Sequence, residues 1–210
     1  GIARDDPAEL AEYLQRGLKF DVLLVSGGTS VGVHDYVRPA IEALGVEMKF
    51  WRVAMKPGHP LAFGVSQRNS DGAPREAFVF GLPGNPVSSM VCFEEFVAPA
   101  LRRMMGHVRI HRRTITARLT HDVRHQAGRT EFIRVTLAKE EGGYAVTSTG
   151  AQGSGMLLSM ARADGLAILS ADCNGLAAGS TVTVTIGEFS ISGIPVADDS
   201  APVSAEKGTP

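Results

Sequence analysis

The chain has 210 residues, with 21 basic and 22 acidic side chains and a formal net charge of −1 at pH 7. This balance gives no overall attraction to nucleic acid or to anionic lipid, so neither is expected as a partner. The chain is 44% hydrophobic, but no apolar run reaches the roughly 18 residues that span a bilayer, which excludes a transmembrane helix. Cys92 and Cys173 lie too far apart for a disulfide framework or a zinc site, which favours the cytoplasm.

Apolar residues at helical spacing predict three helices in the first half, over residues 7–18, 35–44 and 86–105. Asp6 is the expected N-cap of the first helix, with Pro7 in its first turn. Gly45 and Gly106 are the expected ends of the other two helices.

Strands are predicted between these helices, over residues 21–26, 46–53, 61–65 and 77–81. The run DVLLVS at 21–26 has no polar alternation, which is typical of a parallel strand buried on both faces. The polar stretch 66–76 is predicted to be a surface loop. Alternating helices and strands indicate an α/β domain.

The second half is rich in β patterns, with candidate strands at 110–119, 132–137, 144–148, 165–170 and 181–186. This pattern predicts a small barrel or sandwich. The last residues lose the periodicity and gain Ser, Pro and Asp, so a disordered tail is expected. The predicted division is 1–106 for the α/β domain, 107–190 for the β domain and 191–210 for the tail.

A glycine and hydroxyl loop, SGGTSVG, follows the first strand and precedes a helix. It lacks the Gly-Lys-Ser/Thr ending of a Walker loop and the spacing of GxGxxG, and an ordinary tight turn would also explain it. Its position at a strand-to-helix turn nevertheless favours anion binding by exposed backbone N–H groups and hydroxyls. The candidate binding residues are Ser26, Gly27, Gly28, Thr29 and Ser30.

Three acids lie near the ends of predicted elements. Asp35 could cap the helix that follows the glycine loop, or it could hold a magnesium ion that bridges it to a bound anion. Asp5 and Asp6 lie at the equivalent loop of the preceding unit. If both loops meet at one sheet edge, the three carboxylates converge on a metal.

Two further segments carry candidate groups. In MKPGHP, two prolines stiffen a loop that carries Lys56, a point charge suited to an oxyanion, and His59, which can act as a base, a donor or a conditional charge. A rigid solvated turn is the alternative. In GLPGNPVSS, a glycine turn leads into a helix whose first N–H groups, at Val87 to Ser89, are expected to be free for a second anion. The candidate residues in this second segment are Gly84, Asn85, Pro86 and Ser88.

Several other charged residues are interpreted as surface groups. The arginine-rich stretch 96–121 has no acid, but it also lacks interleaved aromatic residues for stacking on RNA, so a solvated face is favoured. His107, His121 and His125 show no metal spacing and are expected at the surface. The loop TGAQGSG, which contains Ser154, is a weak motif by itself.

Taken together, SGGTSVGVHDY, MKPGHP, GLPGNPVSS and TGAQGSG resemble the MoeA family of molybdopterin molybdenumtransferases, which is related to the C-terminal domain of gephyrin. The order and spacing of the motifs match along residues 1–187. The resemblance implies insertion of molybdate into adenylylated molybdopterin with Mg²⁺ and release of AMP, at a pocket between the subunits of a homodimer. It also implies that the chain is the C-terminal half of such a protein, with an incomplete three-layer α/β domain of parallel or mixed sheet and a complete β-barrel domain.

Residue by residue, the resemblance makes Asp5 or Asp6 and Asp35 the acidic metal-binding positions. Lys56 matches the first lysine of the loop that the family writes KPGKP. The second lysine is His59 here, so a constant charge becomes a titratable one. Ser154 matches the serine of the loop with which the C-terminal domain approaches the pocket.

Two other functions share parts of this pattern. A molybdopterin adenylyltransferase shares the α/β fold and a similar SGGT loop, but it normally lacks the appended β domain. A gephyrin-like scaffold uses the same fold to anchor receptors, and loss of Asp35 or Lys56 would be expected in a retired enzyme. Both residues are present, which favours the enzyme.

Overall fold

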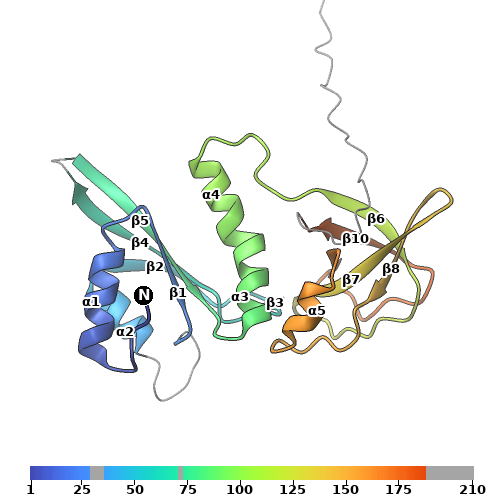
Figure 1. Ribbon diagram of the computed structural model, residues 1–210, viewed down its shortest axis with the longest axis horizontal. Coiled ribbons are helices and arrows are strands. Elements are labelled where there is room, and N and C mark those ends of the chain that lie inside the picture. Colours follow the sequence, from blue (N-terminus) through green and yellow to red (C-terminus); the bar gives the residue numbers. More distant parts are fainter. Residues whose placement is uncertain (29–35, 71–72, 188–210) are drawn as a thin grey trace, which may run out of the picture.

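The structure is a computed structural model that describes residues 1–28, 36–70 and 73–187. Its first half contains α1 (Pro7–Gly17), β1 (Val22–Ser26), α2 (Val37–Ala43), β2 (Val46–Trp51), β3 (Met55–Lys56), β4 (Ala62–Ser70) and β5 (Ala73–Leu82). A long helix follows, composed of α3 (Pro86–Cys92), η1 (Phe93–Val97) and α4 (Ala98–Met104). The second half contains β6 (Thr114–Leu119), β7 (Thr130–Glu140), β8 (Gly143–Ser148), α5 (Leu157–Ala161), β9 (Gly165–Leu169) and β10 (Thr181–Ile186). Figure 1 shows the two halves side by side, with the long helix between them.

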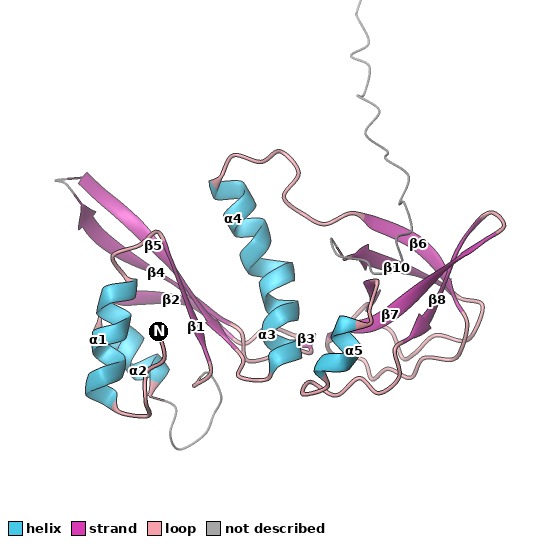
Figure 2. Cartoon of the chain, viewed as in Figure 1, coloured by secondary structure: helices cyan, strands magenta, loops and turns pink. Residues whose placement is uncertain are grey.

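The first half is a three-layer α/β unit built on a mixed sheet in the order β1-β5-β4-β2. β1 runs parallel to β5, and β4 runs antiparallel to both β5 and β2. Successive side chains of β5 point to opposite faces. Val79 packs with α1 and α2, whereas Phe80 packs with α3. Figure 2 shows helices on both sides of this sheet, which confirms the predicted fold class.

The predicted helices are present with small changes at their ends. Asp6 caps α1 as expected, since its Oδ1 accepts a hydrogen bond of 2.8 Å from the Glu9 N–H. Gly45 follows α2 with φ +78°, a left-handed conformation that glycine adopts readily. The helix predicted over 86–105 contains a π-helical turn, η1, directly before α4. Pro99 lies in the first turn of α4 and lacks the N–H that a regular helix would use there, which accounts for the irregular turn.

Two predictions for the first sheet were wrong, one about the burial of a strand and one about a loop. β1 is an edge strand with β5 as its neighbour, and Leu24 remains 41% exposed, so β1 is not buried on both faces. The predicted loop 66–76 is mostly strand, because β4 and β5 continue as an antiparallel hairpin to the pair Ser70 and Ala73. Backbone hydrogen bonds hold such a hairpin without an apolar face, so its polar sequence gave no strand signal.

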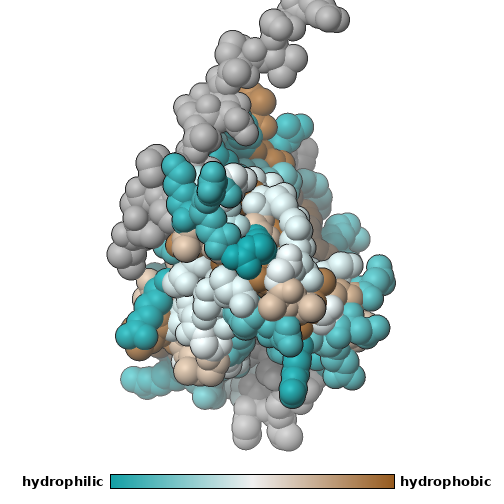
Figure 3. Space-filling view, turned by 90° about the vertical axis from the view of Figure 1, so that its right-hand side faces the viewer, coloured by the Kyte–Doolittle hydropathy of each residue, from teal (hydrophilic) through white to brown (hydrophobic). Residues whose placement is uncertain are grey.

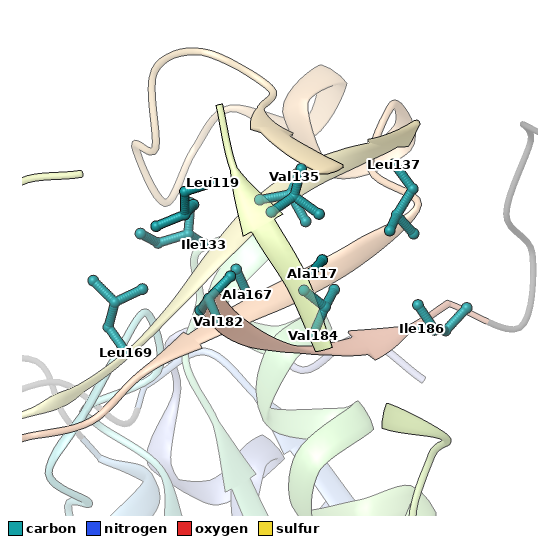
Figure 4. Close-up of a cluster of buried hydrophobic side chains, with 11 residues drawn as sticks. Ala117, Leu119, Ile133, Val135, Leu137, Ala167, Leu169, Val182, Val184 and Ile186 are labelled. Carbon is teal, nitrogen blue, oxygen red and sulfur yellow. The ribbon is translucent and has the colours of Figure 1, made fainter. Parts of the chain in front are cut away.

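The second half closes into a barrel, one of the two forms expected. Its strands follow the order β7-β8-β6-β10-β9, and β9 also pairs with β7. Each barrel strand therefore has a neighbour on both sides, and inward side chains fill the interior. Figure 4 shows this core of aliphatic side chains. Its buried members are Ala117, Leu119, Ile133, Val135, Leu137, Val146, Ala167, Leu169, Val182, Val184 and Ile186.

A two-residue strand joins the halves. β3 lies in the first half of the sequence but pairs in parallel with β7, with Met55 opposite Thr130 and Lys56 opposite Glu131. Leu166 of β9 also packs into the cluster that surrounds α3. The two halves are thus connected by backbone pairing and by shared apolar contacts.

The surface at the barrel end is mixed, with polar side chains around a central area of intermediate hydropathy and scattered apolar ones (Figure 3). None of the helices in the described residues is long and apolar enough to cross a membrane. The tail expected over 191–210 lies outside the described residues.

Candidate functional site

The SGGTSVG and GLPGNPVSS motifs meet at the carboxyl ends of two neighbouring parallel strands, β1 and β5. Ser26 at the end of β1 is opposite Leu82 at the end of β5, and the Gly27 N–H donates a hydrogen bond of 3.1 Å to the Leu82 carbonyl. A Cβ added to Gly84 would lie 3.5 Å from the Gly27 Cα. Gly27 and Gly28 both have positive φ angles, +90° and +63°, which favour glycine. Ligands commonly bind at this edge of α/β sheets.

The rest of the first loop cannot be placed in this site. Thr29, Ser30 and Asp35 lie outside the described residues. The helix that follows begins at Val37 with Tyr36 as its N-cap, so it starts two residues later than predicted. The roles assigned to these three residues remain predictions.

A cavity of about 700 Å³ lies beside the first glycine loop. Its lining includes Asp5, Ser26, Gly27, Gly28 and the side of α1. Asp6 is used as the α1 cap instead. Among the described residues, no three His, Cys, Asp or Glu side chains are grouped as a metal site. Asp5 is therefore the predicted metal-binding carboxylate that lines this cavity.

The second glycine turn places the start of α3 against the barrel half. The Val87 N–H donates to the Ser154 carbonyl at 3.2 Å, and the Ser89 N–H donates to the Asn85 carbonyl at 3.0 Å. The expectation that these amides are free was therefore wrong for Val87 and Ser89. Pro86 takes the first helical position as predicted, while Asn85 occupies the N-cap position without a side-chain capping bond. The contact brings Ser154 to the GLPGNPVSS turn.

The MKPGHP loop packs against the same helix. The Cys92 thiol of α3 donates to the Gly58 carbonyl at 3.5 Å, and a Cβ on Gly58 would lie 2.6 Å from the Cys92 sulfur. His59 Nδ1 lies 2.7 Å from the Val53 carbonyl oxygen. A carbonyl can only accept, so Nδ1 carries the proton and Nε2 is the nitrogen that remains for other contacts.

Lys56 contacts the barrel through a carboxylate that sequence reasoning missed. Its Nζ lies 2.8 Å from Oε1 of Glu131, and the other oxygen of Glu131 lies 2.8 Å from His125 Nδ1. Burial raises the pKa of Glu131, but the hydrogen bonds from Lys56 and His125 more than offset this, so the pKa is lowered overall. The His125 side chain is only 2% exposed, so its interpretation as a surface residue was wrong.

Arg134 is the second missed residue, and it is completely buried. Its Nη2 donates to the Gly153 carbonyl at 3.2 Å, and its backbone is held by Gln152 of the TGAQGSG loop. Neither Nε nor Nη1 has a hydrogen-bond partner among the described residues. Burial lowers the pKa of Arg134, and Glu131 partly opposes this shift. Buried unpartnered donors favour an acceptor at this position.

A sequence signal for these residues exists. Glu131 and Arg134 interrupt the otherwise apolar run EFIRV of a barrel strand. Charged residues are rarely buried unless they are paired, so their presence in such a run indicates a local partner or ligand.

The contacts arrange the predicted residues in two connected groups. The first group surrounds the cavity beside Gly27, and the second joins the MKPGHP loop, the start of α3 and the loop that contains Ser154. Lys56 and Ser154 do not line that cavity. The close approach of Gly84 to Gly27 connects the groups. Backbone N–H groups, a lysine and a buried arginine in this arrangement can bind oxyanions.

Comparison with known families matches both halves. Residues 1–103 match the family described as "Probable molybdopterin binding domain", and residues 116–186 match the family described as "MoeA C-terminal region (domain IV)". A molybdopterin molybdenumtransferase from Haemophilus influenzae is 31% identical over 187 residues, which cover 88% of this chain and 44% of the relative. Molybdopterin molybdenumtransferase 1 from Mycobacterium tuberculosis is 34% identical over 190 residues, which cover 88% of this chain and 43% of that relative.

The fold agrees with a solved structure. The molybdopterin biosynthesis MoeA protein from Pyrococcus horikoshii matches with a TM-score of 0.66 and 33% identity, over 89% of this chain and 42% of that one. The chain thus spans a little under half the length of these relatives.

Proposed function

Since the chain belongs to the MoeA family, we propose that its site serves the insertion of molybdate into adenylylated molybdopterin, with release of AMP. The observation that carries this proposal is the meeting of two glycine turns at one sheet edge, with Gly84 against Gly27. Such an edge can hold the phosphates of a nucleotide on backbone N–H groups. The names of the relatives and the match to both family descriptions support the substrate class.

The contacts support a division of labour among the site residues. The Gly28 amide, with the Ser26 hydroxyl and the predicted contribution of Thr29 and Ser30, binds phosphate, while the Gly27 N–H is used by the Leu82 carbonyl and fixes the turn. Lys56 supplies positive charge for the oxyanion, because its side chain is half-exposed, and the buried Arg134 holds the loop that contains Ser154 through its bond to the Gly153 carbonyl. Ser88 and Ser154 lie at the start of α3 and at the loop that touches it. Holding both reactants close together is then the main contribution to ligand exchange at molybdenum.

Magnesium fits one part of this site. Asp5 lines the cavity and offers a carboxylate, and Mg²⁺ commonly takes its other ligands from substrate phosphates and water. Asp6 is less suited because one of its oxygens caps α1. Asp35 remains the predicted second carboxylate. Bound there, magnesium would neutralise phosphate charge.

His59 distinguishes this chain from the lysine of the family motif. Its Nδ1–H donates to the Val53 carbonyl, so Nε2 gains a proton to offer an anion only when the ring is charged. We therefore expect His59→Lys to tighten molybdate binding, because lysine carries a constant positive charge. Calorimetric titration of both proteins with molybdate tests this, and an unchanged dissociation constant contradicts it.

The decisive experiment compares variants of the full-length protein in molybdate insertion with adenylylated molybdopterin. We expect Lys56→Met and Arg134→Met to lower kcat/KM by about 10- to 100-fold each, because each removes a charged hydrogen-bond donor. Lys49→Met is the matched control, since Lys49 is an exposed lysine paired with Glu47. Unchanged insertion by both site variants contradicts the proposal.

The homodimer and the cytoplasmic location belong to the same proposal. Sedimentation of the full-length protein tests the first, and cell fractionation tests the second. An adenylyltransferase is disfavoured because residues 116–186 match the MoeA C-terminal region.

A further inference from the structure

Lys56 reaches a carboxylate that comes from the other half of the molecule. Glu131 lies opposite Lys56 in the β3–β7 pair, and its Oε1 is 2.8 Å from the lysine Nζ. The Glu131 side chain is 8% exposed, while that of Lys56 is 54% exposed. The carboxylate is therefore fixed in the protein, and the ammonium group faces both the carboxylate and solvent.

His125 holds the second oxygen of this carboxylate. Nδ1 must be the donor to Glu131 Oε2, because an ionised carboxylate only accepts hydrogen bonds. His125 Nε2 is buried without a partner among the described residues. His125 thus orients Glu131 through one carboxylate oxygen, and Lys56 neutralises the carboxylate charge at the other oxygen.

These contacts leave Lys56 only partly available to an anion. An ammonium group has three N–H donors, and Glu131 uses one of them. An anion bound to the remaining donors would lie within about 6 Å of the Glu131 carboxylate and would be repelled by it.

We propose that Glu131 is a positioning residue and an internal counter-ion for Lys56, which keeps oxyanion binding at Lys56 weak enough for release. The proposal rests on the proposed function in one respect, that Lys56 binds the oxyanion. Glu131 holds the ammonium group in place and opposes the negative charge of its ligand. The affinity of Lys56 for an oxyanion therefore depends on Glu131, a residue of the barrel.

The test measures binding of molybdate alone by calorimetry, in the 210-residue chain and in the full-length protein. Glu131→Gln keeps the shape and an oxygen that can accept from Lys56, but it removes the negative charge. We expect it to lower the dissociation constant about 10-fold, which is the effect of one charge at this range in a partly solvated site. Glu140→Gln is the matched control, because Glu140 is an exposed barrel carboxylate paired with Arg118, and no change is expected.

Two further variants separate this inference from the proposed function. Lys56→Met should weaken binding, and Glu131→Gln should bring no tightening in the Lys56→Met background. If Lys56→Met weakens binding but Glu131→Gln leaves it unchanged or weaker, the counter-ion proposal is overturned and the proposed function stands. If Lys56→Met changes nothing, or if none of the proteins binds molybdate, the role of Lys56 in the proposed function fails, and this proposal fails with it.

A second measurement does not depend on the Gln variant folding. The side-chain ammonium signals of ¹⁵N-lysine-labelled protein report hydrogen exchange, and Lys56→Met identifies the Lys56 signal. We expect the Lys56 ammonium to exchange more slowly than that of Lys49, because Glu131 is only 8% exposed whereas Glu47, the partner of Lys49, is 73% exposed, and we expect it to shift when molybdate is added. Equal exchange of the two lysines overturns the proposal.

Discussion

Two short apolar strands, one in each half, have different environments. β1 reads VLLVS and β9 reads GLAIL, so the two runs are similar in length and hydrophobicity. No residue of β1 is fully buried, whereas four of the five in β9 are. β9 pairs with β10 and β7 in a closed barrel, while β1 lies at the edge of its sheet. Burial of these strands follows from the number of neighbours and not from composition.

The difference predicts that the two halves respond unequally to the same substitution. Leu169→Ala removes a side chain that is 1% exposed in the barrel core, and we expect it to lower the free energy of unfolding by about 2 to 5 kcal/mol. Leu24→Ala removes one that is 41% exposed, and about 1 kcal/mol or less is expected. Urea unfolding of both variants measures this. Equal losses would mean that another element covers β1 in solution and would break the comparison.

The junction between the halves should contribute stability that depends on pH. The pKa of Glu131 is lowered in the folded state, so its ion pair stabilises the fold above the ordinary carboxyl pKa. This contribution is lost as the pH falls through the lowered value. We expect Glu131→Gln to be less stable than the unaltered chain near neutral pH, with the gap closing in acid. Thermal unfolding between pH 3 and pH 7 measures the gap, and a gap that widens in acid would contradict the assignment.

The reactivity of the two cysteines, one in each half, gives the comparison with the smallest disturbance, because labelling them leaves the sequence unchanged. Burial raises the pKa of the Cys92 thiol to about 12, and this residue is packed beneath the MKPGHP loop. Cys173 is only partly buried beside the barrel core. Alkylation of the native chain at pH 8, followed by mass spectrometry, should therefore modify Cys173 well before Cys92. Similar rates would show that the first half opens readily around α3.

Local sequence predicted the elements that local forces determine. Apolar spacing and the Asp6 cap indicated α1, and turn glycines such as Gly45 marked where helices end. The edge position of β1 and the pairing of β3 with β7 depend on distant parts of the chain, so no local pattern contained them. The hairpin at the end of β4 and β5 was missed because backbone pairing needs no apolar alternation.

The candidate site also contains some residues that local sequence indicated and others that it did not. The glycine turns were visible in sequence because Gly27 and Gly28 need positive φ angles. Glu131 and Arg134 were missed because their partners, Lys56 and the loop at Gly153, lie far away in the chain, and His125 was missed because its role depends on Glu131. Lys56 was found, but the carboxylate that holds it was not.

The strand β3 also bears on how such a chain can be recombined. The connection over residues 105–113 is the obvious place to join halves from two different homologues. A barrel exchanged there would meet a foreign β3, and Glu131 would face whatever side chain the new loop carries at the position of Lys56. We therefore expect functional chimeras to be those in which the MKPGHP loop and the barrel come from the same homologue. Half of the α/β unit separates these two parts in sequence.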